Sequence, residues 1–137
     1  MDTATRDLVR RRAGDRCEYC HLPQDATPFI TFHIEHVIAK QHTPGDGDVD
    51  NPNRLALSCD RCNLFKGPNL SSIDPESDEI VNLFNPRTDS WTDHFLVRGG
   101  LVIGLSPTGR ATMRLLNMND ARRVDLREQW LEEGGQL

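Results

Sequence analysis

The spacing of apolar residues in the first half of the chain predicts short helices and strands. Residues 2–13 have the pattern of a short helix, with a capping residue ahead of it and a glycine directly after it. Residues 29–38 are rich in β-branched and aromatic side chains with partial alternation, which predicts a strand. A turn-rich loop at 43–48 separates this strand from a second one at 54–57. Residues 63–67 then predict the opening of a short helix.

The second half of the chain has a different pattern. Residues 67–78 are punctuated by proline, serine and aspartate, which predicts an exposed connection. Residues 94–105 hold two apolar stretches around Gly99-Gly100, which predicts a hairpin with a glycine turn. Ser106-Pro107 is expected to cap a helix that carries Ala111, Leu115 and Leu116. Asn119 is expected to cap a last helix whose inner side includes Val124, Trp130 and Leu131.

The composition is that of a soluble globular chain of one domain. The 137 residues are 36% hydrophobic and 27% charged, values typical of folded soluble proteins. No apolar run approaches the roughly 18 residues of a transmembrane helix. The first residues do not have the basic and then apolar segments of a secretory signal peptide. We therefore expect a cytoplasmic protein with no membrane contact.

The charge balance limits how the chain meets nucleic acid. It has 16 Lys and Arg against 21 Asp and Glu, a net charge of −5, so there is no global positive field. Contact with DNA or RNA must then rely on a local patch or a metal ion. The most basic stretch lies in and after the first predicted helix, where the arginines either form a solvated face or contact phosphate; they are Arg6, Arg10, Arg11, Arg12 and Arg16.

The four cysteines form two Cys-x-x-Cys pairs with 38 residues between them. In a reducing compartment two such pairs predict one tetrahedral zinc site, because each pair can hold one edge of the tetrahedron. The alternatives are two disulfides or a redox-active dithiol. Disulfides are not supported, because the sequence shows no secretion signal. A redox-active dithiol needs only one Cys-x-x-Cys pair, so it does not account for two. Four thiolates leave no open position, so the zinc is expected to be structural. Its ligands are Cys17, Cys20, Cys59 and Cys62.

Four polar residues between and beside these pairs carry a resemblance to a known family. Glu35-His36 ends the first predicted strand, Asn53 precedes the second, and Asn63 follows the last cysteine. In this order, with the two cysteine pairs, they resemble the HNH endonucleases, the zinc-stapled ββα-metal nucleases. The matching stretches are Cys17-Glu18-Tyr19-Cys20, Ile34-Glu35-His36-Val37-Ile38, Leu55-Ala56-Leu57-Ser58-Cys59 and Cys62-Asn63-Leu64-Phe65-Lys66-Gly67.

The resemblance implies a role for each polar residue. His36 is expected to be the general base that activates water, since a neutral imidazole accepts a proton near pH 7. Glu35 and Asn63 are expected to bind one divalent cation, most plausibly Mg²⁺, which prefers oxygen ligands. An amide instead of a histidine at Asn63 should favour hard ions over softer ones.

The middle position of the motif departs from the family's pattern. The family's asparagine braces the loop and orients the histidine, but the position five residues before Cys59 holds Arg54. Asn53 lies one residue earlier and is our assignment, with Asn51 as a further candidate.

Arg61 and Lys66 are expected to contact nucleic-acid phosphates, because charge-assisted contacts would offset the acidic surroundings.

The other histidines have plain interpretations. His33 lies three residues before His36, so on an ideal strand the two point to opposite faces, and we expect His33 to be a packing or surface residue. His42 lies in the loop, either solvated or near a phosphate, and His21 is expected to be uninvolved.

The C-terminal half resembles the tail of a group of small bacterial HNH proteins. The matching residues include Leu83-Phe84-Asn85-Pro86-Arg87, Trp91, Asp93-His94-Phe95 and Gly109-Arg110-Ala111-Thr112. Arg87, His94 and Arg110 either contact nucleic acid or attach the tail to the core, and we expect packing roles for Trp91 and His94. The sequence thus predicts one α+β domain, 1–137: a zinc-stapled ββα-metal (HNH) core at 17–67, and a hairpin-plus-helices extension at 68–137 packed on it.

The function predicted from chemistry and resemblance together is metal-dependent hydrolysis of DNA phosphodiester bonds, one nick per active site. The chemistry predicts the hydrolysis, whereas the substrate class follows from the resemblance. The alternative is a non-catalytic zinc-ribbon module that binds nucleic acid.

Overall fold

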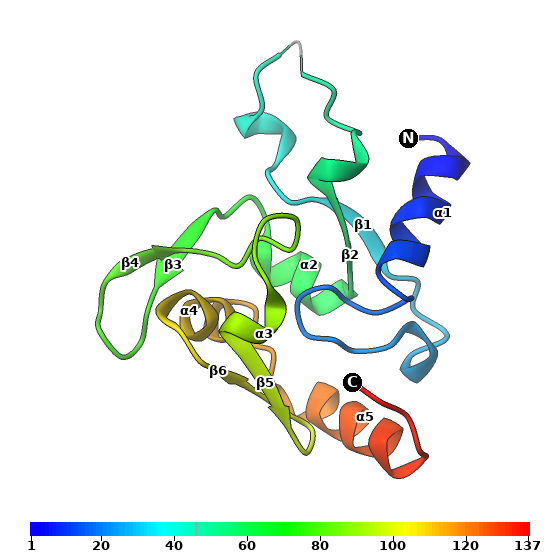
Figure 1. Ribbon diagram of the computed structural model, residues 1–137, viewed down its shortest axis with the longest axis vertical. Helices are drawn as coiled ribbons and strands as arrows, with labels where there is room; N and C mark the ends of the chain where they lie inside the picture. Colours follow the sequence, from blue (N-terminus) through cyan, green and yellow to red (C-terminus); the bar gives the residue numbers. More distant parts are fainter. Residues whose placement is uncertain (46) are drawn as a thin grey trace.

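A β-hairpin followed by a helix forms the centre of the N-terminal half. The computed structural model describes residues 1–45 and 47–137. Strands β1 (His33–His36) and β2 (Leu55–Ser58) pair antiparallel, and helix α2 (Asp60–Lys66) follows β2 directly (Figure 1). This ββα order agrees with the core that the sequence predicts.

Helix α1 (Thr3–Arg12) lies beside this hairpin, at the upper right of Figure 1. Its start is set by Asp2, whose side chain accepts a hydrogen bond from the Thr5 N–H at 2.7 Å. Its last residue, Arg12, donates to the carbonyl oxygens of Pro52 (2.9 Å) and Leu55 (2.7 Å). The predicted helix is confirmed, and one of its arginines is used to hold the start of β2.

The first strand is shorter than the predicted range 29–38. Phe29 is 99% exposed, and the backbone before His33 bonds a side chain instead of a strand. Gln24, at the start of the 3₁₀ turn η1 (Gln24–Ala26), donates to the Ile30 carbonyl at 2.7 Å and accepts from the Phe32 N–H at 2.8 Å. A segment whose backbone groups are satisfied in this way has no need of a partner strand.

Local capping also shifts the neighbouring boundaries. The 3₁₀ turn η3 (Pro52–Arg54) takes up Arg54, so β2 begins one residue later than predicted. Helix α2 begins at Asp60 rather than near residue 63, because the sulfur of Cys59 accepts from the Cys62 N–H and caps it. A further 3₁₀ turn, η2 (Lys40–His42), precedes the predicted loop 43–48, of which residue 46 lies outside the described residues.

The predicted connection 67–78 is wrong in part, because it contains a strand. Strands β3 (Ser71–Ile73) and β4 (Ile80–Asn82) form a hairpin at the left of Figure 1. Its turn is organised by the buried Asp74, which accepts from the Glu76 N–H at 3.1 Å and the Ser77 hydroxyl at 2.9 Å. Periodicity alone does not reveal a three-residue strand that depends on such a turn.

The predicted hairpin at 94–105 is confirmed. After a short helix α3 (Trp91–His94), strands β5 (Phe95–Arg98) and β6 (Leu101–Gly104) pair antiparallel. Helix α4 (Pro107–Leu115) begins as predicted, with the Ser106 hydroxyl accepting from the Gly109 N–H at 2.9 Å.

The last helix, α5 (Ala121–Glu132), differs from the prediction at both its cap and its buried side. Asp120, not Asn119, caps it; the Asn119 side chain instead bonds the backbone N–H and C=O of Val102, each at 2.8 Å. The fully buried positions of α5 are Arg123 and Arg127, rather than the apolar residues expected there. Arg127 donates to the Gly100 and Met118 carbonyls at 2.7 and 2.6 Å.

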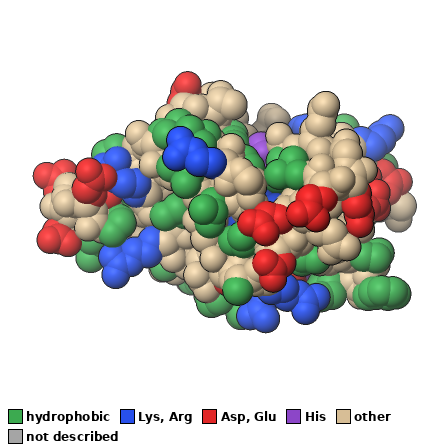
Figure 2. All heavy atoms as spheres, turned by 90° about the horizontal axis from the view of Figure 1, so that it is seen from below, with side chains coloured by type: hydrophobic (Ala, Val, Ile, Leu, Met, Phe, Trp, Pro, Cys, Tyr) green, Lys and Arg blue, Asp and Glu red, His purple; other side chains and the backbone are tan. Residues whose placement is uncertain are grey.

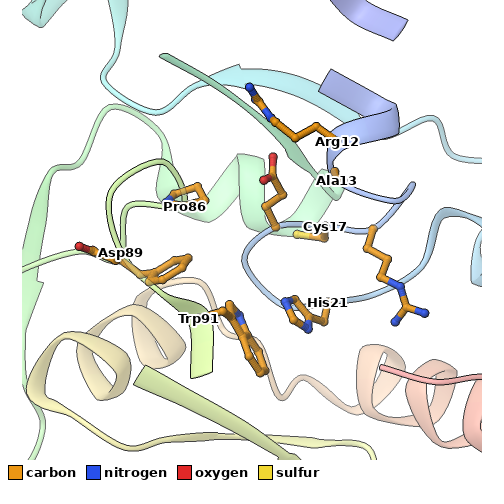
Figure 3. Close-up of a pocket in the computed structure, with 10 residues that line it drawn as sticks. Arg12, Ala13, Cys17, His21, Pro86, Asp89 and Trp91 are labelled. Atoms are coloured by element: carbon orange, nitrogen blue, oxygen red, sulfur yellow. The ribbon is translucent and has the colours of Figure 1, made fainter. Parts of the chain in front are cut away.

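One hydrophobic cluster joins the two halves of the chain. Trp91 stacks on His21, with ring centroids 3.7 Å apart, and donates to the Tyr19 carbonyl at 2.8 Å. Figure 3 shows the two rings facing each other at the edge of a hollow of about 260 Å³. Glu18, which also lines this hollow, pairs with Arg87. The buried cluster includes the four cysteines together with Val9, Phe32, Leu55, Leu57, Phe84, Phe95, Val102, Leu116 and Met118.

The surface mixes charges of both signs. The face that carries the lower elements of Figure 1 shows acidic, basic and apolar side chains side by side (Figure 2). Among the described helices, none has the length and apolar character that crossing a membrane requires.

Candidate metal and nuclease site

The four cysteines come together as the sequence predicts. Their sulfur atoms all lie within 4.8 Å of one another and are buried, and Cys20 Sγ is 3.7 Å from Cys59 Sγ. Four sulfurs at about 2.3 Å from a zinc ion would stand about 3.8 Å apart in a regular tetrahedron. The size, burial and all-sulfur composition of the cluster therefore fit one structural zinc.

The protonation of these sulfurs would differ between the metal-free and the metal-bound cluster. Burial raises the pKa of the Cys17 and Cys62 thiols, whereas hydrogen bonds, first of all with Cys17, lower the pKa of Cys20. Without a metal the sulfurs would share protons, because several adjacent thiolates repel one another. A divalent cation keeps all four ionised.

Arg123 is a residue of this site that the sequence analysis missed. Its Nη1 donates to Cys62 Sγ at 3.1 Å and lies 3.8 Å from Cys59 Sγ. Its Nη2 donates to the carbonyls of Leu116, at 2.7 Å, and Asn117. Four thiolates around Zn²⁺ carry a net charge of −2, which a buried guanidinium partly offsets. The sequence feature that could have indicated its role was the spacing of Arg123 and Arg127, four residues apart on one face of the predicted helix.

His36 ends β1 and keeps contact with solvent. Its side chain is 19% exposed, and its Nε2 lies 2.9 Å from Oδ1 of Asp50. This hydrogen bond is the main reason that the pKa of Asp50 is lowered. Asp50 was not among the predicted site residues; its position immediately before Asn51 in the motif was the signal available.

Glu35 lies inside the protein. Its residue is 7% exposed, its Oε1 accepts from the Tyr19 hydroxyl, and its Oε2 is 3.6 Å from Nζ of Lys66. Burial raises the pKa of Glu35, and Lys66 opposes that shift. Burial, and then the neighbouring Glu35 carboxylate, raise the pKa of Tyr19, which therefore stays a protonated donor.

Lys66 does not have the surface position expected of a phosphate contact. It is 2% exposed, and its ammonium donates to the Val37 carbonyl at 2.8 Å. The correction has a simple cause: the last turn of α2 packs against the end of β1, so this lysine faces the interior and is the counter-ion of Glu35. Arg61, near the start of the same helix, is exposed.

Asn63 is half-buried on α2. Within residues 1–45 and 47–137, no hydrogen bond joins the Asn63 side chain to His36 or Glu35. In the same part of the chain, the four cysteines are the one group of three or more His, Cys, Asp or Glu residues whose ligand atoms are close enough to share an ion. Mg²⁺ commonly uses only one or two protein carboxylates and completes its shell with water and substrate phosphate. A catalytic cation here would depend on the substrate in this way.

Of the three candidates for the middle position, Asn51 has the side chain that braces the loop. Its Oδ1 accepts from the Asn53 N–H at 2.9 Å and caps the turn η3. Asn53, our assignment from the sequence, is exposed, as is Arg54, and both line a shallow hollow with His42. The loop contact expected of Asn53 is thus made by Asn51.

His33 and His21 have contacts other than His36. His33 is exposed and pairs with Ser58 across the hairpin. His21 packs on Trp91, and burial lowers its pKa to about 4. Neither forms a hydrogen bond with the His36 side chain among the described residues.

Comparison with known proteins identifies the core. Residues 17–69 match the family model described as HNH endonuclease. This segment is similar to the HNH endonuclease domains. Its ββα order and its four-cysteine cluster agree with the zinc-stapled form of the HNH fold. The identification covers the segment that holds His36, Glu35 and Asn63.

One curated relative is similar to more of the chain than the family model covers. The Septu protein PtuB of Bacillus thuringiensis is 27% identical over 112 residues, which cover 82% of this chain and 40% of that protein. The similarity therefore reaches past the HNH domain of the present chain but spans less than half of the relative. No solved structure matches the chain.

Proposed function

We propose that this HNH domain is a metal-dependent endonuclease that hydrolyses phosphodiester bonds of DNA and makes one nick per active site. The observation that carries the proposal is His36, which stands partly exposed at the end of β1, within the matched segment. The substrate class follows from the family. A reducing compartment such as the cytoplasm suits the chain, because it keeps four thiols available for zinc.

In this proposal His36 is the general base. Its neutral imidazole takes a proton from water as the water oxygen attacks phosphorus. A divalent cation, when bound, would polarise the phosphate and stabilise the leaving oxygen. Glu35 and Asn63 are the protein oxygens proposed to hold that cation, with Mg²⁺ the ion that suits them best.

The position of Glu35 predicts how this cation would bind. Oε2 of Glu35 already faces the ammonium of Lys66 at 3.6 Å, so Lys66 and a divalent cation compete for the same carboxylate. We therefore expect weak cation binding in the free protein and stronger binding when a substrate phosphate supplies further oxygen ligands.

Nucleic-acid contact is proposed to be local. The exposed Arg61 is our candidate phosphate contact on α2, and α1 presents exposed arginines such as Arg6 and Arg11. Affinity should fall with salt, with a slope set by the number of phosphates that these arginines contact. Phosphate contacts of this kind do not discriminate DNA from RNA.

Nicking of supercoiled plasmid in Mg²⁺, with and without chelator, tests the proposal, followed by single-turnover cleavage of a labelled duplex. His36→Ala should slow cleavage by about 10²–10⁴-fold, the usual contribution of a general base. His33→Ala is the matched control and should retain most activity, because His33 is exposed and lies elsewhere on the strand. Binding measured with Ca²⁺ in place of Mg²⁺ should be the same for all three proteins. Equal losses in both variants would remove His36 from the catalytic role.

The alternative function is a non-catalytic zinc-containing module that binds nucleic acid. The Glu35–Lys66 pair favours it, because an internal ion pair needs no metal at that carboxylate. Tight binding without cleavage in any divalent cation would support this alternative. Mg²⁺-dependent cleavage that His36→Ala abolishes would exclude it.

A further inference from the structure

The loop between β1 and β2 brings the carboxylate of Asp50 into contact with His36. Asp50 lies 14 residues after His36, and its Oδ1 is 2.9 Å from Nε2 of the imidazole. The His36 side chain is 19% exposed and that of Asp50 is 36% exposed. The pair is therefore partly shielded, and solvent still reaches the imidazole.

The chemistry of this contact determines which nitrogen carries the proton. The hydrogen bond with His36 lowers the pKa of Asp50, so at neutral pH Asp50 is an ionised carboxylate and can only accept hydrogen bonds. Nε2 must then carry the hydrogen. In a neutral imidazole that leaves Nδ1 unprotonated, with its lone pair available.

We propose that Asp50 is a positioning residue for His36, which holds the imidazole as the Nε2–H tautomer so that Nδ1 is the atom that accepts the proton of the attacking water. This inference rests on the proposed nuclease function. During the step one O–H bond of water breaks, its proton moves to Nδ1, and the water oxygen bonds to phosphorus. The leaving oxygen departs with its electron pair and takes a proton from solvent, and His36 returns its proton to solvent afterwards.

The surroundings of the pair suit this role. The imidazolium that forms during the step would face the Asp50 carboxylate, which stabilises its positive charge, as the third residue of a Ser-His-Asp triad does. The loop around Asp50 is held by Asn51, whose side chain accepts from the Asn53 N–H at 2.9 Å and whose own N–H donates to the Asp48 carbonyl at 3.2 Å. The amino group of Met1 is the nearest cation, 3.6 Å from Oδ2 of Asp50.

Three variants of the full chain test the role. Asp50→Asn can turn its amide so that it donates to Nε2, which would move the hydrogen to Nδ1; the corresponding change in a triad lowers kcat about 10⁴-fold. We expect kcat to fall by about 10²–10⁴-fold, with KM and the affinity for DNA in Ca²⁺ unchanged. Asp50→Glu, which keeps the carboxylate, should recover part of the rate. Asp48→Asn removes the same charge from an exposed residue of the same loop and should leave kcat unchanged.

A spectroscopic measurement reads the tautomer without reference to activity. ¹⁵N NMR of labelled protein should show Nδ1 of His36 unprotonated in the wild type and protonated in Asp50→Asn. A wild type with Nδ1 protonated, or an Asp50→Asn variant with the wild-type kcat, would overturn the inference even if His36→Ala is inactive. A kcat loss that Asp50→Glu fails to recover, or that is matched by a loss of DNA affinity, would also overturn it. If the wild type shows no metal-dependent cleavage, the proposed nuclease function fails, and the NMR result alone decides whether Asp50 sets the tautomer.

Discussion

Arg123 of the last helix donates a hydrogen bond from Nη1 to Sγ of Cys62 at 3.1 Å, across 61 residues of sequence. The same guanidinium also bonds the backbone that leads into α5, at Leu116 and Asn117. One side chain thus connects the C-terminal helix to the cysteine cluster of the HNH domain. The stability of the tail and the occupancy of the metal site are expected to depend on each other.

Replacing Arg123 should reveal this dependence. Arg123→Gln removes a buried cation and leaves carbonyl groups and anionic sulfurs without their donor, so we expect a loss of about 3–5 kcal/mol in the free energy of unfolding. Urea denaturation measures it, and Arg122→Gln, at an exposed neighbouring position, is the control. Arg123→Gln should also lose its zinc to a competing chelator at a lower chelator concentration than the wild type, whereas Arg122→Gln should not. Zinc retention equal to that of the wild type would separate Arg123 from the zinc site.

The zinc site itself should be essential for folding. We expect one zinc per chain by metal analysis, and a poorly folded protein for Cys59→Ser. Structural zinc sites contribute on the order of 10–16 kcal/mol, against a typical domain stability of about 5–15 kcal/mol. Cys59 also caps α2, so its loss should weaken that helix too. A purified chain without zinc but with an intact fold and a cooperative melting transition would contradict the prediction.

Changes at the proposed cation ligands should alter the Mg²⁺ dependence of cleavage and leave the zinc in place. Glu35→Gln and Asn63→Ala each remove an oxygen ligand, and we expect the Mg²⁺ titration of the cleavage rate to shift to higher concentration in both. Metal analysis should still find one zinc per chain, because neither residue belongs to the cysteine cluster. Unchanged titration curves would refute the ligand assignment without refuting nuclease activity.

The two basic residues of α2 should behave in opposite ways. Lys66→Ala leaves Glu35 without its buried partner, so the free energy of unfolding should fall by about 3–5 kcal/mol. Arg61→Ala should leave stability unchanged and reduce the salt dependence of DNA binding by about one unit of slope. Urea denaturation and binding titrations at several salt concentrations measure the two effects. A stable Lys66→Ala variant with weakened binding would restore Lys66 as a phosphate contact.

The tail contains a carboxylate whose charge should stabilise the fold at neutral pH. Arg110 holds Asp74 in two hydrogen bonds of 2.9 Å, which keep the pKa of Asp74 well below its usual range. A lowered pKa means that folding favours the ionised form, so this stabilisation is present above about pH 4 and is lost as pH falls through the folded-state pKa. Asp74→Asn should melt at a lower temperature at pH 7 and should show less further loss on acidification.

Asp78→Asn is the matched control for this pH dependence. Asp78 is exposed in the same turn and has φ of 61°, a conformation that asparagine tolerates. Melting temperatures of both variants and the wild type at pH 7, and across the acid range, make the comparison. If Asp74→Asn and Asp78→Asn lose equal stability at pH 7, the Asp74–Arg110 pair does not contribute as we expect.

The sequence by itself determined the features that depend on a few neighbouring residues. The spacing of Cys17 and Cys20, repeated at Cys59 and Cys62, was enough for the four-sulfur cluster, because two residues between cysteines suit one edge of a tetrahedron. The cap at Ser106 was equally readable, since a capping side chain bonds backbone two or three residues away. The order of the motif residues was enough to predict the similarity to the HNH family.

Only the tertiary structure decided which charged residues are internal. Lys66, Arg123 and Arg127 are residue types usually found at the surface, yet all three are buried. Each donates hydrogen bonds to groups that are close in space but distant in sequence. The contact of Asp50 with His36 likewise closes a loop of 14 residues. Spacing along the chain carries no information about such pairings, because burial of a charge is favourable only where packing brings its counter-charge and hydrogen-bond partners to the same point.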